Sequence, residues 1–287
     1  MPADKYSAVW VSHSSITAFL SCPRAYFLSN IYRDPATGHK ITLMSPPLAL
    51  GQAVHELIET LSYLPSDQRF RKPLATQFDA VWQKISGVRG GFTDQKAETA
   101  YKESGKAMIK RLVNHPGPLE KLAVKIKMDL PYFWLSQEQN IILCGKIDWL
   151  EYLPDESVHI IDFKTSTKDE NPRSLQLPIY FLLAQNCQKH PVAKASYWYL
   201  RRSDAPTEMP LPNPIEARDN VLKIAKEVKL ARQLRRFKCR SNGCSACRPL
   251  ETIVRGEATF VGIDTYNQDV YILEKPKTEN TEDSVIL

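Results

Sequence analysis

The sequence predicts an α/β fold in which a mixed central sheet is flanked by helices, with a helical insertion ahead of the sheet. Three apolar runs follow one another in residues 122–135, 140–153 and 157–165, and each has the composition of a buried strand. A helical pattern in residues 175–187 and a further strand pattern in residues 194–201 come next. Strands in sequence, then a helix and another strand, are typical of a mixed sheet with helices packed on it.

The part of the chain before these strands is predicted to be mainly helical. Ser14 or Ser15 can cap a first helix, whose apolar residues then recur at helical spacing. Residues 34–48 have the composition of a loop, and residues 50–64 the pattern of a helix. Residues from about 60 to 120 carry few strand signals, which predicts the helical insertion.

The C-terminal part is predicted to contain a long basic helix and a hairpin. In residues 216–237, apolar and basic residues both recur at steps of three or four, which indicates an amphipathic helix with a basic outer face. That face is either a solvated surface or a stripe that contacts phosphates. Residues 258–273 predict a hairpin and residues 275–287 a disordered tail, so a single domain is expected over residues 1–274.

Composition indicates an ordinary globular protein. Of the 287 residues, 43% are hydrophobic and 24% charged, and the net charge of +6 is too mild to identify a nucleic-acid partner by itself. No apolar stretch is long enough to span a membrane, and the first residues lack the order of a secretion signal. The expectation is a cytoplasmic protein that does not contact a membrane.

Two aspartates and a lysine stand out because they interrupt strands that are otherwise apolar. Asp148 and Asp162 lie at the ends of two neighbouring strand runs, and Lys164, two residues after Asp162, shares its side of the sheet. Converging carboxylates repel one another, and magnesium or manganese relieves that repulsion because both prefer oxygen ligands. A lysine beside the metal can orient a water and stabilise charge on a phosphate. The alternative is that all three are ordinary exposed or turn residues.

Four segments occur in the order that is typical of one nuclease family. The stretch GKIDWLEYLPDESVHIIDFKTS resembles the core motif of the PD-(D/E)XK nuclease superfamily, in the RecB-like branch that includes AddB nuclease domains and a CRISPR-adaptation nuclease family. SSITAFLSCPRAYFL, LGQAVHELIE and LQLPIYFLLA resemble three further motifs of that branch. The resemblance implies a restriction-endonuclease-like fold and a RecB-like nuclease domain, although Ile147 stands where the superfamily has its proline.

The resemblance also implies roles for individual residues. Asp148 and Asp162 would bind magnesium or manganese, with the Phe163 carbonyl as a further ligand and Lys164 as the catalytic lysine. His55 matches the metal-ligating histidine of the RecB-like branch. Two more matches are Gln176 and Tyr180, one helical turn apart, which would position the lysine or the DNA backbone. Without the resemblance, His55 would be read as an ordinary helix residue.

The cysteines indicate a second metal centre. Cys239, Cys244 and Cys247 form a C-x4-C-x2-C pattern, and Cys22 is the natural fourth ligand for zinc or a 4Fe-4S cluster. One early and three late cysteines are similar to the iron-sulfur staple of AddB-type nucleases, although the close pair here follows the third cysteine instead of preceding it. The prediction is a 4Fe-4S cluster, with zinc as the alternative.

Three functions are compatible with these patterns. The leading one is a Mg/Mn-dependent deoxyribonuclease, expected from the resemblance to be an exonuclease on single-stranded DNA ends in recombination, repair or defence. The second is a DNA-binding or structural subunit of a helicase–nuclease complex that does not cut, and either could work with a helicase or recombination partner. In the third, the chain is a zinc protein whose Asp-x-Lys sequence is incidental.

Overall fold

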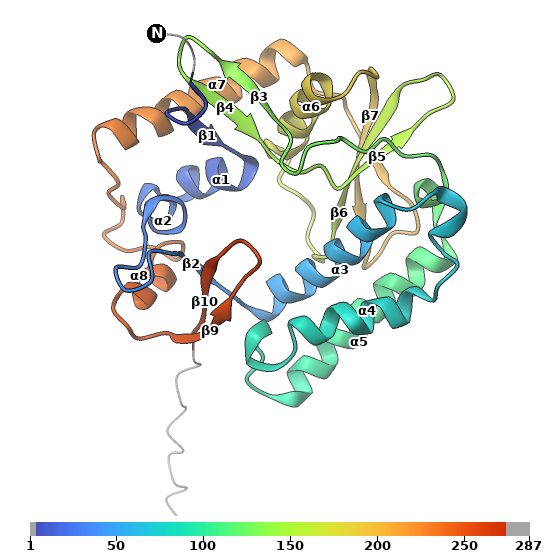
Figure 1. The fold of residues 1–287 in the computed structure, drawn as a ribbon, viewed down its shortest axis with the longest axis horizontal. Coiled ribbons are helices and arrows are strands. Elements are labelled where there is room, and N and C mark those ends of the chain that lie inside the picture. The colour runs from blue at the N-terminus through green and yellow to red at the C-terminus, as the bar shows by residue number, and fades with distance from the viewer. Residues whose placement is uncertain (1–3, 274–287) are drawn as a thin grey trace, which may run out of the picture.

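The computed structural model describes residues 4–273 as an arrangement of helices around three small sheets (Figure 1). The predicted tail, residues 275–287, lies outside the described residues. The main helices are α1 (His13–Ser21), α2 (Pro23–Tyr26), α3 (Pro46–Ser62), α4 (Leu74–Lys84), α5 (Gln95–Asn114), α6 (Gln176–Cys187), α7 (Pro214–Gln233) and α8 (Arg248–Val254). The strands are β1 (Val9–Val11), β2 (Lys40–Leu43), β3 (Tyr132–Ser136), β4 (Ile141–Cys144), β5 (Trp149–Tyr152), β6 (Val158–Lys164), β7 (Val192–Tyr199), β8 (Thr207–Met209), β9 (Thr259–Ile263) and β10 (Gln268–Ile272).

A four-stranded mixed sheet, in the order β5-β6-β7-β8, forms the centre of the fold. β5 and β6 are antiparallel, as predicted, with Trp149 opposite Ile161. β6 and β7 are parallel and are connected through α6, so this part of the chain is a β-α-β unit. The predicted α/β class, with mixed sheets and flanking helices, is therefore confirmed.

The predicted continuous strand over residues 140–153 is wrong, because the chain divides it between two sheets. β4 pairs with β3 and, in parallel, with β1, whereas β5 pairs with β6. The four residues between them, 145–148, leave the first sheet before the second begins. As a result, Asp148 lies immediately before β5 and not at a strand's end. Since β5 and β6 are antiparallel, this still brings it beside the last residues of β6.

Two apolar cores cover the two faces of β6. Val158 and Ile160 belong to a core with α1, α6 and α7, whereas Ile161 and Phe163 belong to a core with α3, α4 and α5. Because side chains alternate along a strand, Asp162 shares its face with Ile160 and Val158 and therefore faces α6. Burial on both faces explains why this strand has a continuous apolar sequence.

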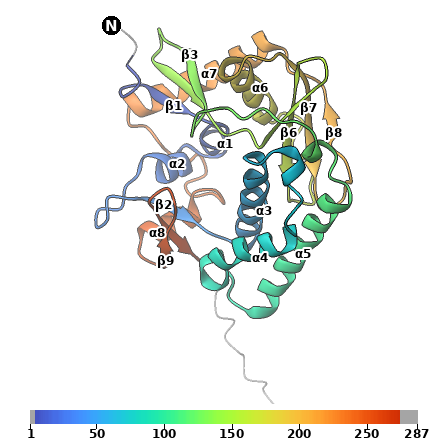
Figure 2. The same ribbon diagram turned by 45° about the vertical axis from the view of Figure 1, so that its right-hand side comes forward.

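The predicted helical insertion consists mainly of α4 and α5, which pack beside α3 on its side away from α1 and α2 (Figure 2). The three helices approach closely at Gly105 of α5. A Cβ atom at this position would lie 2.3 Å from a ring carbon of Phe78 and 3.0 Å from Leu50. This packing holds α3, and with it His55, against the central sheet.

Two N-terminal predictions need correction. Ser12, not Ser14 or Ser15, caps α1, and it does so in a capping box with Ser15, whose hydroxyl accepts the Ser12 backbone N–H. The predicted loop over residues 34–48 contains β2 and the first turn of α3. β2 is too short to show an alternating pattern, and it is held by parallel pairing with β10 of the predicted C-terminal hairpin. Within residues 4–273, none of the helices combines the length and the apolar character that a membrane crossing demands.

Acidification is expected to destabilise the fold through His159 in β6. Its Nδ1 lies 2.9 Å from Glu151 Oε2 and its Nε2 lies 2.7 Å from Ser196 Oγ. Burial lowers the pKa of His159, although Glu151 acts in the opposite direction; Lys194 and Glu208 are the other charged groups nearby. Because the unfolded imidazole takes up its proton at a higher pH than the folded one, the free energy of unfolding should fall as the pH drops below about 6.5.

Urea unfolding at about pH 7.5 and about pH 5.5 measures this effect. His159→Gln, which cannot titrate, should show a smaller loss of stability between the two pH values than the wild type. An equal loss in both proteins would assign the effect to other groups.

Candidate active site

Six predicted site residues converge where β6 ends, β5 begins and α3 and α6 meet the sheet. They are His55, Asp148, Asp162, Lys164, Gln176 and Tyr180. α3 contributes His55, and α6 contributes Gln176 at its start and Tyr180 one turn later. Asp148 immediately precedes β5, and Asp162 and Lys164 lie at the end of β6. The central region of the ribbon in Figure 1 contains this meeting point of α3, α6 and β6.

Asp148 connects α3 to the end of the sheet. Its Oδ2 lies 3.3 Å from His55 Nδ1 and accepts a hydrogen bond of 3.0 Å from the backbone N–H of Phe163. In an antiparallel ladder, the N–H and C=O of one residue point to the same neighbouring strand. The Phe163 carbonyl therefore points to the same edge as its N–H, which is the edge where Asp148 lies.

Asp162 and Lys164 lie on the α6 side and are held together by Gln176. Lys164 Nζ lies 2.9 Å from Asp162 Oδ2 and donates a hydrogen bond to Gln176 Oε1. Gln176 Nε2 donates to Asp162 Oδ1 at 2.6 Å and lies 3.3 Å from the Tyr180 hydroxyl. Both Asp162 and Gln176 are buried, so the amide fixes the acid and the lysine in one arrangement.

Two polar residues of the site were missed by the sequence analysis. Glu170 Oε2 lies 3.0 Å from Lys164 Nζ, and His13, at the start of α1, lies close enough to Lys164 and Glu170 for their charges to influence its pKa. Burial is the largest influence and lowers the pKa of His13. Glu170 belongs to an irregular segment between β6 and α6, where no periodic sequence pattern predicts toward which residues its side chain points.

The protonation states show a site with more acidic than basic groups. Burial and the charge of Asp148 raise the pKa of Asp162 to about 7, which the attraction of Lys164 only partly offsets. Burial would lower the pKa of His55, but Asp148 and Asp162 raise it to about 9. Burial would raise the pKa of Asp148, but His55 keeps it below its usual value. The negative charge of Asp148 is thus balanced by a protonated His55, whereas Asp162 holds its own proton more readily than an ordinary aspartate does.

The donor types of this group are those that a hard divalent cation prefers. Asp162 Oδ2 is buried and lies 2.9 Å from Lys164 Nζ, but no group in the described part of the chain donates a well-aligned hydrogen bond to it. A buried carboxylate oxygen without such a donor is costly, and a hard cation would satisfy it. The donors available are the carboxylates of Asp148 and Asp162, His55 and the Phe163 carbonyl. These oxygen and imidazole ligands suit magnesium or manganese better than a soft metal.

Two cavities open beside His55. The first, of about 230 Å³, is lined by Asp148, Lys146, Glu59 and part of the segment 123–131; we call it the inner cavity. The second, of about 690 Å³, lies between α3 and the β9–β10 hairpin; we call it the hairpin cavity. Glu59, which lines both cavities, forms an ion pair of 3.2 Å with Lys146. Both cavities therefore have charged walls and reach His55, and the inner cavity also reaches Asp148.

The predicted basic helix is α7, and it lies away from these cavities. None of its residues lines either the inner or the hairpin cavity. Lys229 donates a hydrogen bond of 2.7 Å to the Gln139 carbonyl, and Arg218 one of 3.1 Å to the Leu135 carbonyl. Part of the basic face thus fastens α7 to the β3–β4 hairpin, and a role of the remainder in guiding DNA stays a prediction.

The four predicted cysteines meet in one cluster. The Sγ atoms of Cys22, Cys239, Cys244 and Cys247 all lie within 4.8 Å of one another, with 3.7 Å between Cys244 and Cys247. Hydrogen bonds from the N–H groups of Gly243 and Ser241 lower the pKa of the Cys239 thiol to about 6. A cluster of thiols with backbone donors to sulfur is a suitable metal-binding group. Cys144 and Cys187 are outside the cluster, as expected.

One family model matches most of the chain. The model of the PD-(D/E)XK nuclease superfamily covers residues 10–249, a range that contains the acidic site and all four clustered cysteines. A comparison with curated proteins finds no match.

Proposed function

Because the chain belongs to the PD-(D/E)XK nuclease superfamily, we propose that it is a Mg²⁺- or Mn²⁺-dependent deoxyribonuclease of the RecB-like branch. In this proposal it is an exonuclease that hydrolyses single-stranded DNA from its ends during recombination, repair or defence. It works in the cytoplasm as a single domain over residues 1–274, alone or with a helicase or recombination partner. Members of the superfamily are generally metal-dependent nucleases that act on DNA.

The convergence of Asp148, Asp162 and Lys164 is the observation that supports this proposal most directly. Asp148 and Asp162, which come from different segments of the chain, share a buried region with Lys164. Burial and the charge of Asp148 raise the pKa of Asp162 to about 7. Purely structural ion pairs rarely bury more acidic than basic groups, because a buried charge without a partner costs about 3–5 kcal/mol. A site that is meant to hold a cation gains from the same arrangement.

The acidic residues and His55 form the metal-binding half of the proposed mechanism. Asp148, Asp162, His55 and the Phe163 carbonyl would hold the ion, which when bound supplies Lewis-acid stabilisation of the charge on the phosphate. The Phe163 N–H fixes the orientation of Asp148 through its hydrogen bond of 3.0 Å.

Lys164 is the other part of the proposed mechanism, and residues of α6 hold it in position. Its Nζ orients the attacking water and places a fixed positive charge beside the phosphate that is cleaved. Gln176 restrains Lys164 and Asp162 together, and the Tyr180 hydroxyl restrains Gln176 in turn. Glu170, 3.0 Å from Lys164, raises the pKa of the lysine together with Asp162, against the effect of burial, so Lys164 is cationic at neutral pH.

The cysteine cluster is proposed to hold a structural metal centre. A 4Fe-4S cluster is the content that the family resemblance implies, and zinc is the alternative. The sulfur spacing within 4.8 Å accommodates one tetrahedral ion directly, because a Zn–S distance of about 2.3 Å corresponds to about 3.8 Å between sulfurs. In a 4Fe-4S cluster each thiolate binds a different iron, so the four sulfurs would have to lie further apart than they do in this structure. Iron, sulfide and zinc per chain, measured on protein purified without oxygen, decide between the two; the absence of all three would contradict the centre.

Cleavage of end-labelled DNA tests the proposed activity. Single- and double-stranded substrates are incubated with Mn²⁺, Mg²⁺ or EDTA, and the products are resolved with time. The expected result is metal-dependent loss of nucleotides from single-stranded ends, reduced at least about a hundredfold in Asp162→Asn, which keeps the shape of the side chain but removes its charge. Intact DNA under all conditions, bound by a folded protein, would favour the non-cutting DNA-binding subunit.

A further inference from the structure

Two large aromatic side chains are exposed on the walls of the cavities beside the candidate active site. Tyr63, at the end of α3, lines the inner cavity and has 65% of its surface exposed. Tyr266, in the turn between β9 and β10, lines the hairpin cavity and is 70% exposed. His55 and Glu59 line both cavities, so the two rings lie on either side of the proposed metal ligand.

Tyr63 is held in place by charged neighbours and not by apolar packing. Its hydroxyl donates a hydrogen bond of 3.3 Å to Glu59 Oε1, and Lys125 Nζ lies 3.8 Å from the centre of its ring. The same Glu59 oxygen accepts a hydrogen bond of 3.2 Å from Lys146. The ring is thus fixed in orientation while most of its surface remains open to solvent.

Tyr266 is presented by a turn that does not need a tyrosine. Asp264 Oδ1 accepts the N–H groups of Tyr266 and Gln268, both at 2.9 Å, and Asn267 takes the left-handed conformation at φ 58°. Asp and Asn are the residues that build such a turn, whereas the side chain between them is free to vary. A large ring at this position therefore calls for an explanation other than the turn.

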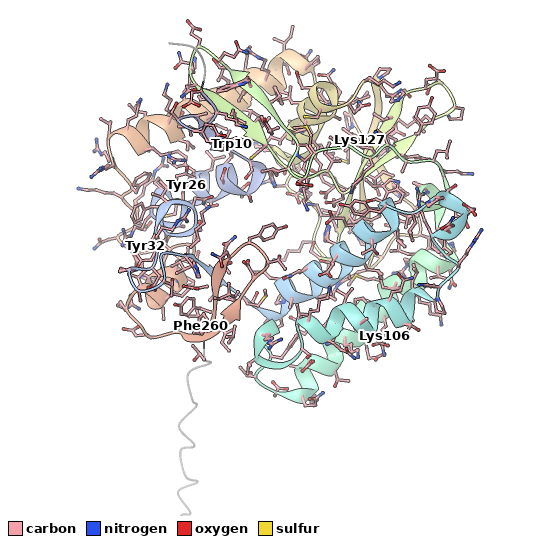
Figure 3. The ribbon with its side chains drawn as sticks, in the orientation of Figure 1. Trp10, Tyr26, Tyr32, Lys106, Lys127 and Phe260 are labelled. Atoms are coloured by element: carbon pink, nitrogen blue, oxygen red, sulfur yellow. The ribbon has the colours of Figure 1, made fainter. Side chains whose placement is uncertain are left out.

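The two tyrosines border a common charged pair. Glu59, which accepts the hydrogen bond from the Tyr63 hydroxyl, lines both cavities and lies 3.2 Å from Lys146. Lys146 belongs to the short segment that precedes Asp148. In Figure 3 the hairpin, marked by Phe260, and the segment carrying Lys127 lie on opposite sides of the central region. The hairpin and the segment 123–131, which line the hairpin cavity and the inner cavity, thus face the site from two directions.

Each cavity wall offers one cation that could contact a phosphate, beside acidic groups. Lys125 and Lys146 line the inner cavity, where Lys146 is paired with Glu59. Lys84 and Arg89 line the hairpin cavity, where Lys84 is paired with Glu56. Among the described residues, Lys125 forms no ion pair. Among residues 4–273, none forms an ion pair or a hydrogen bond with the side chain of Arg89, which is exposed. Exposed rings next to cations that can contact phosphates are the combination with which proteins bind unpaired nucleotides, because every base has a face on which to stack.

We propose that Tyr63 and Tyr266 form a stacking subsite for the bases of single-stranded nucleic acid on either side of the candidate active site. This inference deepens the proposed function and rests on it, because it names the groups that would favour an unpaired strand. Duplex DNA keeps its bases stacked on one another and cannot offer their faces to the tyrosines. The subsite therefore accounts for a single-strand preference without any contact that reads base sequence.

Binding measured in EDTA tests the subsite without cleavage. The full chain is titrated against a fluorescently labelled thymidine oligonucleotide and against an abasic strand of equal length and charge. Wild-type protein should bind the thymidine strand more tightly. Tyr63→Ala and Tyr266→Ala should each weaken that binding about five- to hundredfold and leave binding of the abasic strand unchanged. Tyr63→Phe and Tyr266→Phe, which keep the ring, should bind nearly as the wild type does.

Tyr6→Ala provides the matched control. Tyr6 is 87% exposed but lines neither cavity, so its loss should leave both strands bound as before. Equal affinity of the wild type for the two strands, no measurable binding of the thymidine strand, or an equal loss for both strands in the alanine variants would overturn the inference. Cleavage with Mn²⁺ reports separately on the proposed function. A protein that prefers the thymidine strand yet never cuts refutes only the nuclease, and one that cuts without that preference refutes only the subsite.

Discussion

Lys164→Ala is expected to lower the rate of metal-dependent DNA cleavage by at least about a thousandfold. The variant loses the positive charge that lies 2.9 Å from Asp162 Oδ2 and 3.0 Å from Glu170 Oε2. It also leaves Gln176 Oε1 without its lysine donor. The proposed ligands Asp148 and His55 stay in place, so the loss should appear in the rate at saturating DNA and not in DNA affinity.

Single-turnover cleavage at saturating protein concentration measures this rate, and anisotropy in EDTA measures affinity. Lys194→Ala is the matched control, because this lysine of β7 forms a half-exposed ion pair with Glu208 and is distant from the site in the sheet register. Circular dichroism and thermal unfolding show whether both variants fold. A Lys164→Ala protein that is folded and cleaves at the wild-type rate would remove the lysine from the mechanism.

The acidic site could be predicted because strand periodicity controls its main contacts. In β6 every second residue faces α6, so a spacing of two places Lys164 beside Asp162 whatever the rest of the fold does. The hairpin between β5 and β6 then fixes Asp148 opposite that end. Gln176 and Tyr180 are predicted from the family resemblance, and the helical turn that separates them explains why both reach the site. Local geometry therefore accounts for the positions of these residues, whereas the resemblance is needed to assign their roles.

Other parts depend on contacts that no local pattern contains. The break between Cys144 and Trp149 occurs because the two halves of the segment pair with different strands. A continuous apolar sequence does not reveal with which distant strand each of its parts will pair. β2 exists through its pairing with β10, more than 200 residues later. Glu170 reaches Lys164 from an irregular segment whose path is set by neighbouring elements.

Cys22→Ala is expected to remove the metal centre and to loosen the C-terminal segment, with the central sheet unchanged. The apolar cluster around the cysteines is small: its buried members are Cys22, Ala25 and Cys247. So few side chains provide little hydrophobic stabilisation, about 2 kcal/mol each at most, whereas a structural zinc site contributes about 10 kcal/mol or more. The link joins positions more than 200 residues apart in the sequence. Without it, the loop and α8 should open more often than the core strands do.

Metal analysis and hydrogen exchange measure the two consequences. Cys22→Ala should contain less than about a tenth of the wild-type metal, and amide protection in residues 239–257 should fall about a hundredfold or more, since about 3 kcal/mol corresponds to that factor. Protection in β6 should stay the same, because its cores lie elsewhere. Cys144→Ala removes a buried cysteine outside the cluster and should keep both the metal and the protection. If Cys22→Ala keeps its full metal content, Cys22 is not a ligand, and the staple between the N- and C-terminal segments must be provided by other contacts, such as the ion pair of 3.1 Å between Arg24 and Glu251.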